Sequence, residues 1–340
     1  MARQRMIPAI RTSDDSVIVA VASGSAERAW AFAKANEIPT SYGSVDALVA
    51  DDHVDAVYVG STNDKHAAHV IAAARAHKHV LCEKPLAMTL SEAVAMQEAC
   101  ASSGIVFGTN HYHRLKPSHV TIRRLIREGA IGTPLCAQLT FGIQLAPEQR
   151  TWRMNSVDSG GGVALDLTVH DADILRNLFE DEVANVVAIA SRRARDQGTL
   201  DDSVVGAMRM RSGLVVSFLD SFVIPAAVHA ITVLGNEGSI LGDNIFRSDS
   251  DGTVTLRRQG ASEPIALPAW ENPFRVSIRA FNNSIRGIGT PAVSGVDGVK
   301  SLAVALAVLR SSESGCITPV VDVDSLLQRV GKRASHSIGE

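Results

Sequence analysis

The first part of the chain alternates between short apolar runs and segments with helical periodicity. The apolar runs are Val17–Ala22, Val54–Gly60, His79–Cys82 and Ile105–Gly108, and the helical segments are Ser25–Ala35, Lys65–His77 and Ser91–Ser102. Continuous apolar runs separated by helices are typical of parallel strands that are buried on both faces. The alternation therefore predicts an N-terminal doubly wound, Rossmann-type α/β domain over residues 1–112.

The alternation starts with a helix instead of a strand. Met1–Arg11 has helical spacing of its apolar residues, and the first apolar run follows a turn at Thr12–Asp15. A dinucleotide-binding fold opens with an apolar strand and a Gly-rich turn ahead of its first helix, and this sequence contains neither. Either the natural chain starts upstream of Met1, or it lacks the turn that binds a pyrophosphate and the central strand of its sheet.

The pattern changes after about residue 132, where strand-like segments separated by turn residues follow one another. These segments are Leu135–Gln144, Ala184–Arg192, Ser203–Met210, Val215–Phe222 and Ala227–Leu234. A helical segment, Gly160–Phe179, interrupts them, and two more helices, Phe274–Ile288 and Asp297–Arg310, are predicted near the end. The pattern predicts a C-terminal α+β domain over residues 113–340 with a mostly antiparallel sheet.

Polar or small residues follow the predicted strands of the first domain. They are Ser23-Gly24, Ser61-Thr62-Asn63 and Glu83-Lys84-Pro85, and Asn110 follows the last strand. In open α/β sheets, ligands bind outside the carboxyl ends of the strands, so these segments predict a long ligand laid across the sheet edge. Lys84 could donate a hydrogen bond or a proton to a substrate oxygen there, although a surface lysine is the alternative interpretation.

Ser23 and Arg28 indicate which dinucleotide the domain prefers. NAD-binding domains commonly place Asp or Glu at this strand end to bind the ribose 2′-hydroxyl, and here the residue is a neutral serine. An acid would repel a 2′-phosphate, whereas Ser23 and Arg28 can bind one through charge-assisted hydrogen bonds. We therefore predict NADP(H); the alternative for Arg28 alone is a solvated helix face.

Glycines 160–162 lead into a helical segment that carries Asp166 and His170. The acid and the imidazole lie one helical turn apart on one face, where the carboxylate can orient the ring. Glycines at a helix entrance also let a ligand approach backbone N–H groups. The alternative is a weak surface ion pair. Trp152 and Arg153, just before the glycines, could cover a nicotinamide, bind a sugar, or simply pack.

In combination, these motifs resemble the two signatures of the glucose–fructose oxidoreductase / inositol dehydrogenase / MocA family. Glu83-Lys84-Pro85 resembles the first, and Gly160–Gly162 with Asp166 and His170 resembles the second. The resemblance covers essentially the whole chain and implies that Lys84 and His170 are catalytic, with Asp166 beside them. It implies a cofactor site lined by Ser23, Gly24, Arg28, Ser61, Thr62, Asn63, Asp64, Lys65, His66, Glu83, Lys84, Asn110, Trp152 and Arg153.

The function that follows from this resemblance is reduction of a sugar-derived ketone by hydride transfer from NADPH. The alternatives are an NAD(P)-dependent dehydrogenase of another sugar or cyclic polyol, and a non-catalytic NADP-binding regulatory protein. The presence of Lys84, Asp166 and His170 favours an enzyme, because a protein that only binds the dinucleotide needs none of them.

Composition limits the partners. A net charge of −3 does not attract nucleic acid or an anionic membrane, and no apolar run is long enough to span a bilayer. The widely spaced cysteines match no metal or disulfide pattern, and the spacing of His111, His113 and His119 matches no usual metal site. We expect a cytoplasmic protein with no metal that binds a small sugar and forms a homo-oligomer through its C-terminal sheet.

Overall fold

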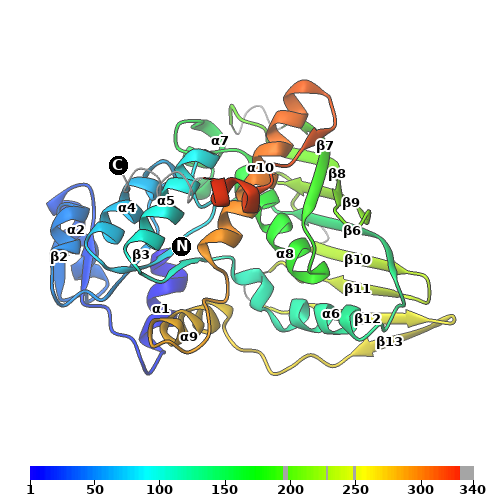
Figure 1. Cartoon of the computed structure of the whole chain (residues 1–340), viewed down its shortest axis with the longest axis horizontal. Coiled ribbons are helices and arrows are strands. Elements are labelled where there is room, and N and C mark those ends of the chain that lie inside the picture. The colour runs from blue at the N-terminus through cyan, green and yellow to red at the C-terminus, as the bar shows by residue number, and fades with distance from the viewer. Residues whose placement is uncertain (194–197, 227–228, 248–249, 330–340) are drawn as a thin grey trace. The chain divides into compact units, whose positions relative to one another are not determined.

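The chain divides into two compact units in a computed structural model that describes residues 1–193, 198–226, 229–247 and 250–329 (Figure 1). The first unit comprises Met1–Tyr112 and Asn272–Val299, and the second comprises His113–Glu271 and Lys300–Glu340. The sequence places residues 113–340 in one domain, whereas Asn272–Val299 belongs to the first unit. The physical reason is burial, since Phe274 and Ile278 pack in one apolar cluster with Met6 and Tyr112.

The first unit contains the alternating elements that the sequence predicts. Its helices are α1 (Ile7–Arg11), α2 (Ala26–Ala35), α3 (Val45–Val49), α4 (His66–Arg75), α5 (Leu90–Ser102) and α9 (Pro273–Ile285), with a π-helix (Ala2–Met6) before α1. Its strands are β1 (Ala20–Ala22), β2 (Thr40–Tyr42), β3 (Ala56–Val59), β4 (His79–Cys82) and β5 (Phe107–Thr109). Local capping explains several helix starts: Ser25 and Ser44 accept backbone N–H bonds at α2 and α3, and Thr89 forms a capping box with Glu92 at α5.

The parallel strands of the first unit form two sheets, β1–β2 and β3–β4–β5, among the described residues. In the doubly wound strand order 3-2-1-4-5-6, the strand between these two groups is the first one. The described elements ahead of β1 are the π-helix Ala2–Met6 and α1, and the two ladders are separate. The predicted strand Val17–Ala22 is wrong in its extent: only Ala20–Ala22 pairs, and the Val17 side chain is 79% exposed.

The second unit is built on one large sheet. Its strands are β6 (Pro134–Gly142), β7 (Val183–Ser191), β8 (Ser203–Met210), β9 (Val215–Ser221), β10 (His229–Gly235), β11 (Ser239–Asp243), β12 (Thr253–Arg258), β13 (Ala261–Ile265) and β14 (Thr318–Pro319). Across the described residues the order is β13-β12-β11-β10-β6-β9-β8-β7-β14, and β6 and β9 are parallel while the other neighbours are antiparallel. The mostly antiparallel sheet is confirmed; residues 227 and 228 of the predicted strand Ala227–Leu234 lie outside the described residues.

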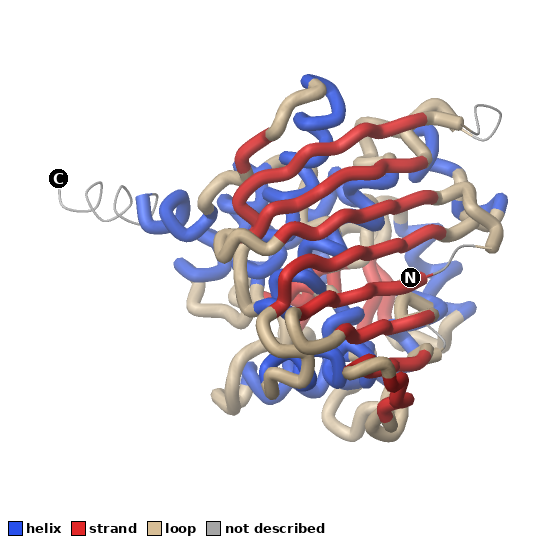
Figure 2. Tube along the Cα trace, turned by 90° about the vertical axis from the view of Figure 1, so that its right-hand side faces the viewer, coloured by secondary structure: helices blue, strands red, loops and turns tan. Residues whose placement is uncertain are grey.

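Helices cover one face of this sheet. Side chains of α6 (Pro117–Arg127), α8 (Val169–Phe179) and α10 (Gly295–Ser314) share one apolar cluster with the inward-facing residues of β6–β12. Helix α7 (Thr151–Asn155) and a π-helix (Ala164–Thr168) precede α8. The opposite face of the sheet is open in Figure 2 and carries exposed apolar side chains such as Ile189 and Val205, which are paired across β7 and β8.

In the part of the chain that the structure describes, every helix is too short or too polar to cross a lipid bilayer.

Candidate active site

The carboxyl end of β1 brings together the residues predicted to choose between NAD and NADP. Ser23 continues the ladder, since its N–H donates to Tyr42 O at 3.1 Å. Ser25 caps α2 by accepting the Arg28 N–H at 3.2 Å. The Arg28 side chain folds back over Gly24, where a Cβ would lie 3.2 Å from its Nη2 atom. Gly24 and Arg28 are exposed and Ser23 is half-buried, so the strand ends in a serine hydroxyl with the Arg28 guanidinium beside Gly24.

His66 joins the segments that follow β3 and β4. Its ring is fully buried, with Nδ1 2.9 Å from Pro85 O and Nε2 3.2 Å from Ser61 O. Burial lowers the pKa of His66. The Ser61 hydroxyl lies 3.1 Å from Nδ1 of His69 on α4. These bonds fix the loop of predicted cofactor residues 61–66; within it Asn63 is buried, Ser61 and Thr62 are half-buried, and Asp64 and Lys65 face solvent.

Glu83 lies at the end of β4 and accepts hydrogen bonds from both neighbouring strands. Its Oε1 accepts from Tyr58 Oη of β3 at 2.6 Å and from Asn110 Nδ2, just after β5, at 2.7 Å. Its Oε2 accepts the backbone N–H of Lys84 at 3.3 Å. Glu83 and Asn110 are 6% and 0% exposed, so their polar groups are used inside the unit. Their predicted contact with a cofactor stays a prediction.

Lys84 is half-buried at the same strand end, between the buried residues Glu83 and Pro85. The residue follows the central strand of the β3–β4–β5 sheet, and its predicted contact with a substrate oxygen stays a prediction. Its backbone is fixed on both sides, because Glu83 accepts its N–H and the carbonyl of the next residue contacts His66. The ammonium group is thus carried by a rigid segment, which is what general acid chemistry requires of a proton donor.

Glycines 160–162 have a different role from the predicted one. Their N–H groups donate to Val157 O, Ser156 O and Arg153 O at 2.8–2.9 Å, so the prediction that they are open to a ligand is wrong. Gly161 is required by close packing, since a Cβ there would lie 2.6 Å from Trp152 O. The glycine segment thus holds α7, the helix that carries Trp152 and Arg153.

Arg153, Trp152 and Asp166 form a cluster in the second unit. The Arg153 guanidinium lies over the Trp152 ring, 4.5 Å from its centroid, and its Nε is 3.4 Å from Asp166 Oδ2. The two charged side chains are 30% and 16% exposed, so the pair is partly shielded from water. Asp166 lies in the π-helix Ala164–Thr168, a geometry that often marks functional segments. That Asp166 orients His170 stays a prediction.

His170 lies in the first turn of α8 and is 4% exposed. Its ring meets the ring of His113 edge-on, with centroids 4.6 Å apart, and Phe141 lies behind it at 6.2 Å. The His119 ring lies 6.1 Å from that of His113, and burial together with the Lys116 charge lowers the pKa of His119 to about 3. The rings of His113 and Phe141 therefore surround the buried side of His170.

Two further buried groups were not predicted from the sequence. The carboxyl groups of Asp171 and Asp220 are fully buried and interact with each other, and the Thr168 hydroxyl donates to Asp220 Oδ2 at 2.5 Å. Burial raises the pKa of Asp220 to about 7 and raises that of Asp171 well above its usual range, with the Asp220 charge as a second cause. The other missed residue is Tyr58, the donor to Glu83. Tyr58 and Asp220 could each have been found in the sequence, because each is a polar residue within an otherwise apolar strand.

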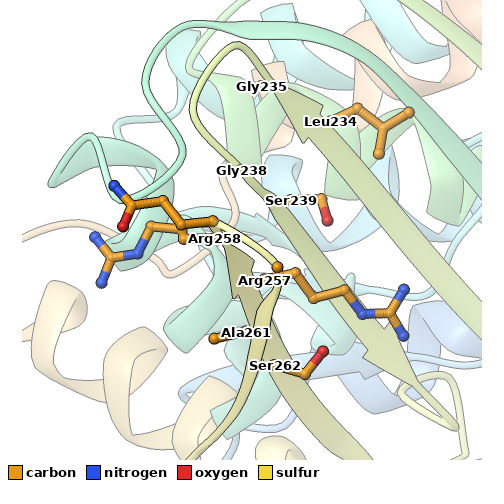
Figure 3. Close-up of a pocket in the computed structure, with 10 residues that line it drawn as sticks. Leu234, Gly235, Gly238, Ser239, Arg257, Arg258, Ala261 and Ser262 are labelled. Carbon is orange, nitrogen blue, oxygen red and sulfur yellow. The ribbon is translucent and has the colours of Figure 1, made fainter.

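A surface hollow of about 370 Å³ lies elsewhere, at the β10–β11 turn and the β12–β13 hairpin (Figure 3). It is lined by Ser239, Arg257 and Arg258 among others, and includes none of the predicted site residues. The side chains of Arg257 and Arg258 point in different directions in Figure 3, so their charges do not converge on one ligand.

Comparisons with known proteins match both halves of the chain. The model of an oxidoreductase family with an NAD-binding Rossmann fold, GFO/IDH/MocA, matches residues 1–111, and that of the GFO/IDH/MocA C-terminal domain matches residues 119–241. The chain is 43% identical to 1,5-anhydro-D-fructose reductase of Ensifer adhaerens over 316 residues, 93% of this chain and 94% of the relative. It is 26% identical to myo-inositol 2-dehydrogenase of Thermotoga maritima over 315 residues, 89% and 91% of the two chains.

The fold is also similar to that of a solved enzyme, the aldose-aldose oxidoreductase of Caulobacter crescentus in complex with glycerol. The TM-score is 0.83 at 26% identity, and the alignment covers 92% of this chain and 95% of the other.

Proposed function

Because this chain belongs to the GFO/IDH/MocA family of oxidoreductases, we propose that it reduces a sugar-derived ketone with NADPH. The family that the sequence motifs indicated is thereby confirmed, and the protein is an oxidoreductase that acts on CH–OH groups or the corresponding ketones. The proposed substrate is 1,5-anhydro-D-fructose, and the product is 1,5-anhydro-D-mannitol. The similarity over 93% of the chain to a reductase of that sugar supports this substrate.

The residues at the strand ends fit a nicotinamide dinucleotide with a 2′-phosphate. Ser23 and the folded-back Arg28 offer a hydroxyl and a guanidinium, and the residue at the strand end is a serine instead of an acid. Residues 61–66, Lys84 and Asn110 follow the other strand ends, and we propose that they line the rest of the site with Trp152 and Arg153. When bound, the cofactor supplies the hydride that reduces the substrate carbonyl carbon.

We propose that residues of the protein stabilise and neutralise the negative charge that develops on the carbonyl oxygen. We assign to Lys84 Nζ a hydrogen bond to that oxygen, because the ammonium group of a half-buried lysine on a fixed strand end can stabilise an alkoxide as it forms. We assign to the His170 imidazole a role as proton donor or relay at the same oxygen, with Asp166 holding the imidazole in place. The observation that carries the proposal is Lys84, half-buried on a segment that Glu83 fixes.

A turnover assay tests the function. The purified protein is mixed with NADPH and 1,5-anhydro-D-fructose, and the decrease in NADPH absorbance is followed as the cofactor is oxidised. The stereochemistry of the product is determined afterwards. Myo-inositol with NADP⁺ is the second arm, because a relative of the chain is an inositol dehydrogenase. Turnover of the polyol but not of the ketone would replace the proposed substrate with a polyol, and turnover of neither would contradict it.

The cofactor preference gives a prediction for Arg28. The enzyme should prefer NADPH over NADH by at least about tenfold in kcat/KM, because the guanidinium pairs with the 2′-phosphate. Arg28→Ala should raise KM for NADPH by about tenfold and leave KM for NADH nearly unchanged. Lys34→Ala is the matched control, since Lys34 is a cation on the same helix that stacks on Trp30 instead. Equal use of both cofactors by the unmodified enzyme contradicts the assignment.

We further propose that the open face of the large sheet joins two copies of the chain. Ile189 and Val205 are cross-strand neighbours there, 76% and 52% exposed, and Val187 and Val215 add to the apolar surface. The double variant Ile189→Lys/Val205→Lys should be a monomer by light scattering, because buried like charges would oppose each other across the two-fold axis. Ile288→Lys, an exposed isoleucine of the other unit, should leave the assembly unchanged. A monomeric unmodified protein at micromolar concentration would rule out the interface.

A further inference from the structure

A hydrogen-bond network connects the carboxyl ends of all three strands in the sheet β3–β4–β5. The acceptor is Glu83 at the end of the central strand, and the donors come from the strand on either side. The Tyr58 hydroxyl is 2.6 Å from Glu83 Oε1, a distance typical of a strong bond between a hydroxyl and a charged acceptor. The Asn110 amide donates to the same oxygen at 2.7 Å.

The network extends to α9 through Asn110. Ser277 Oγ donates to Asn110 Oδ1 at 3.3 Å, and the backbone N–H of Asn110 donates to Cys82 O at 2.8 Å. Asn110 is fully buried and Ser277 is 5% exposed. Each polar side chain of the network thus has a partner inside the unit, so the network rigidifies the strand ends as a whole.

Tyr58 is held in place from behind. A Cβ at Gly60 would lie 2.8 Å from Cε1 of the Tyr58 ring, so the ring lies directly against the backbone of Gly60. The rest of the ring packs against the cluster that contains Leu81, Tyr112 and Phe274. Burial and the charge of Glu83 raise the pKa of Tyr58 well above its usual range, so the hydroxyl keeps the proton that it donates.

We propose that Tyr58 is a positioning residue for Lys84 and acts through Glu83. Tyr58 and Asn110 share Oε1 of Glu83, which leaves Oε2 directed at the backbone N–H of Lys84. Without the tyrosine hydroxyl, a buried carboxylate oxygen loses its shortest bond, and the carboxylate can turn and release the Lys84 N–H. The proposal rests on the proposed role of Lys84, since Tyr58 contributes only by fixing the segment that carries that lysine.

Tyr58→Phe tests this role because it removes one oxygen and keeps the ring. With NADPH and 1,5-anhydro-D-fructose, kcat should fall about 5–20-fold, because small displacements of a catalytic group are costly, while the NADPH Kd stays within about twofold. Tyr42→Phe is the matched control: it also removes a hydroxyl that donates to a carboxylate, Asp51 Oδ2 at 2.9 Å, but away from Lys84. Its kcat should be normal. Gly60→Ala keeps the Tyr58 hydroxyl but pushes on the ring, and should lower kcat in the same direction.

A double-mutant cycle with Glu83→Gln separates positioning from a general loss of stability. If Tyr58 acts through Glu83, adding Tyr58→Phe to Glu83→Gln should lower kcat by less than about twofold further. Additive losses, or a Tyr58→Phe protein with a lower Tm and an unchanged kcat, would overturn the proposal. The variant Lys84→Met distinguishes failure of this proposal from failure of the proposed function. Normal turnover in Lys84→Met would show that Lys84 has no catalytic role. If Lys84→Met loses turnover but Tyr58→Phe has normal kinetics, only the positioning role of Tyr58 is contradicted.

Discussion

Replacing His170 or Lys84 should lower kcat by about 10²–10⁴-fold while the NADPH Kd changes little, because each group is proposed to act only as the alkoxide forms. His170→Ala and Lys84→Met are the variants, and kcat, NADPH Kd and Tm are measured for both. Asp166→Asn should cost less than His170→Ala, because Asp166 is proposed only to hold the ring and is also paired with Arg153. Its effect should shrink in the His170→Ala background.

The control for His170 is His119→Phe. His119 is fully buried near the same ring cluster and packs against Phe246 at 5.6 Å, and its pKa of about 3 keeps it neutral. The phenylalanine keeps this contact, so the variant should fold and turn over at the normal rate. Normal turnover in a folded His170→Ala protein would instead make His170 a structural residue of α8.

Asp171→Asn should make the protein more stable at pH 8 and remove much of its pH dependence of unfolding. Folding raises the pKa of both carboxyls of the Asp171–Asp220 pair, mainly through burial. The protonated pair therefore contributes its full stability below about pH 4, and this is lost as pH rises through the Asp220 pKa of about 7. The loss between pH 4 and pH 8 should be roughly 2–4 kcal/mol.

An asparagine at position 171 can donate to Asp220 without any bound proton, which is why the variant should escape this loss. Thermal unfolding at several pH values measures the difference. Asp173→Asn is the matched control on the same helix, because the Asp173 carboxylate is paired with the Arg114 guanidinium. That variant should be destabilised, because the Arg114 guanidinium loses its partner. Equal destabilisation by Asp171→Asn at pH 5 and pH 8 would show that the pair carries no shared proton.

Strands β1, β3, β4 and β5 of the first unit and five strands of the large sheet could be predicted because their apolar runs are long or alternate clearly. Strand β2 (Thr40–Tyr42) and strands β11–β14 could not, since they are short or polar and are fixed by their neighbours in the sheet. The placement of Asn272–Val299 depends on burial of Phe274 in one cluster with Met6 and Tyr112, residues far apart in the sequence that no local pattern brings together.

Some residues of the candidate site could likewise be predicted from the sequence, and others could not. Lys84, Glu83 and His170 could be found because they stand in recognisable motifs at predictable element ends. The glycines at 160–162 were correctly singled out but given the wrong role, because a sequence does not show whether a backbone N–H is already bonded. Tyr58 and the Asp171–Asp220 pair were missed, since each acts through a partner on another strand or helix that only the register brings close.

The two parallel sheets of the first unit are separate ladders, so neither aligns the other through backbone hydrogen bonds. A ligand that reaches both Arg28 in the first turn of α2, which follows β1, and Lys84, which follows β4, would connect the two sheets. Its apparent affinity would then be reduced by the fraction of molecules in which the two sheets are already aligned, and binding would in turn raise that fraction. Cofactor binding and the alignment of the two sheets would thus be thermodynamically linked, so that each stabilises the other.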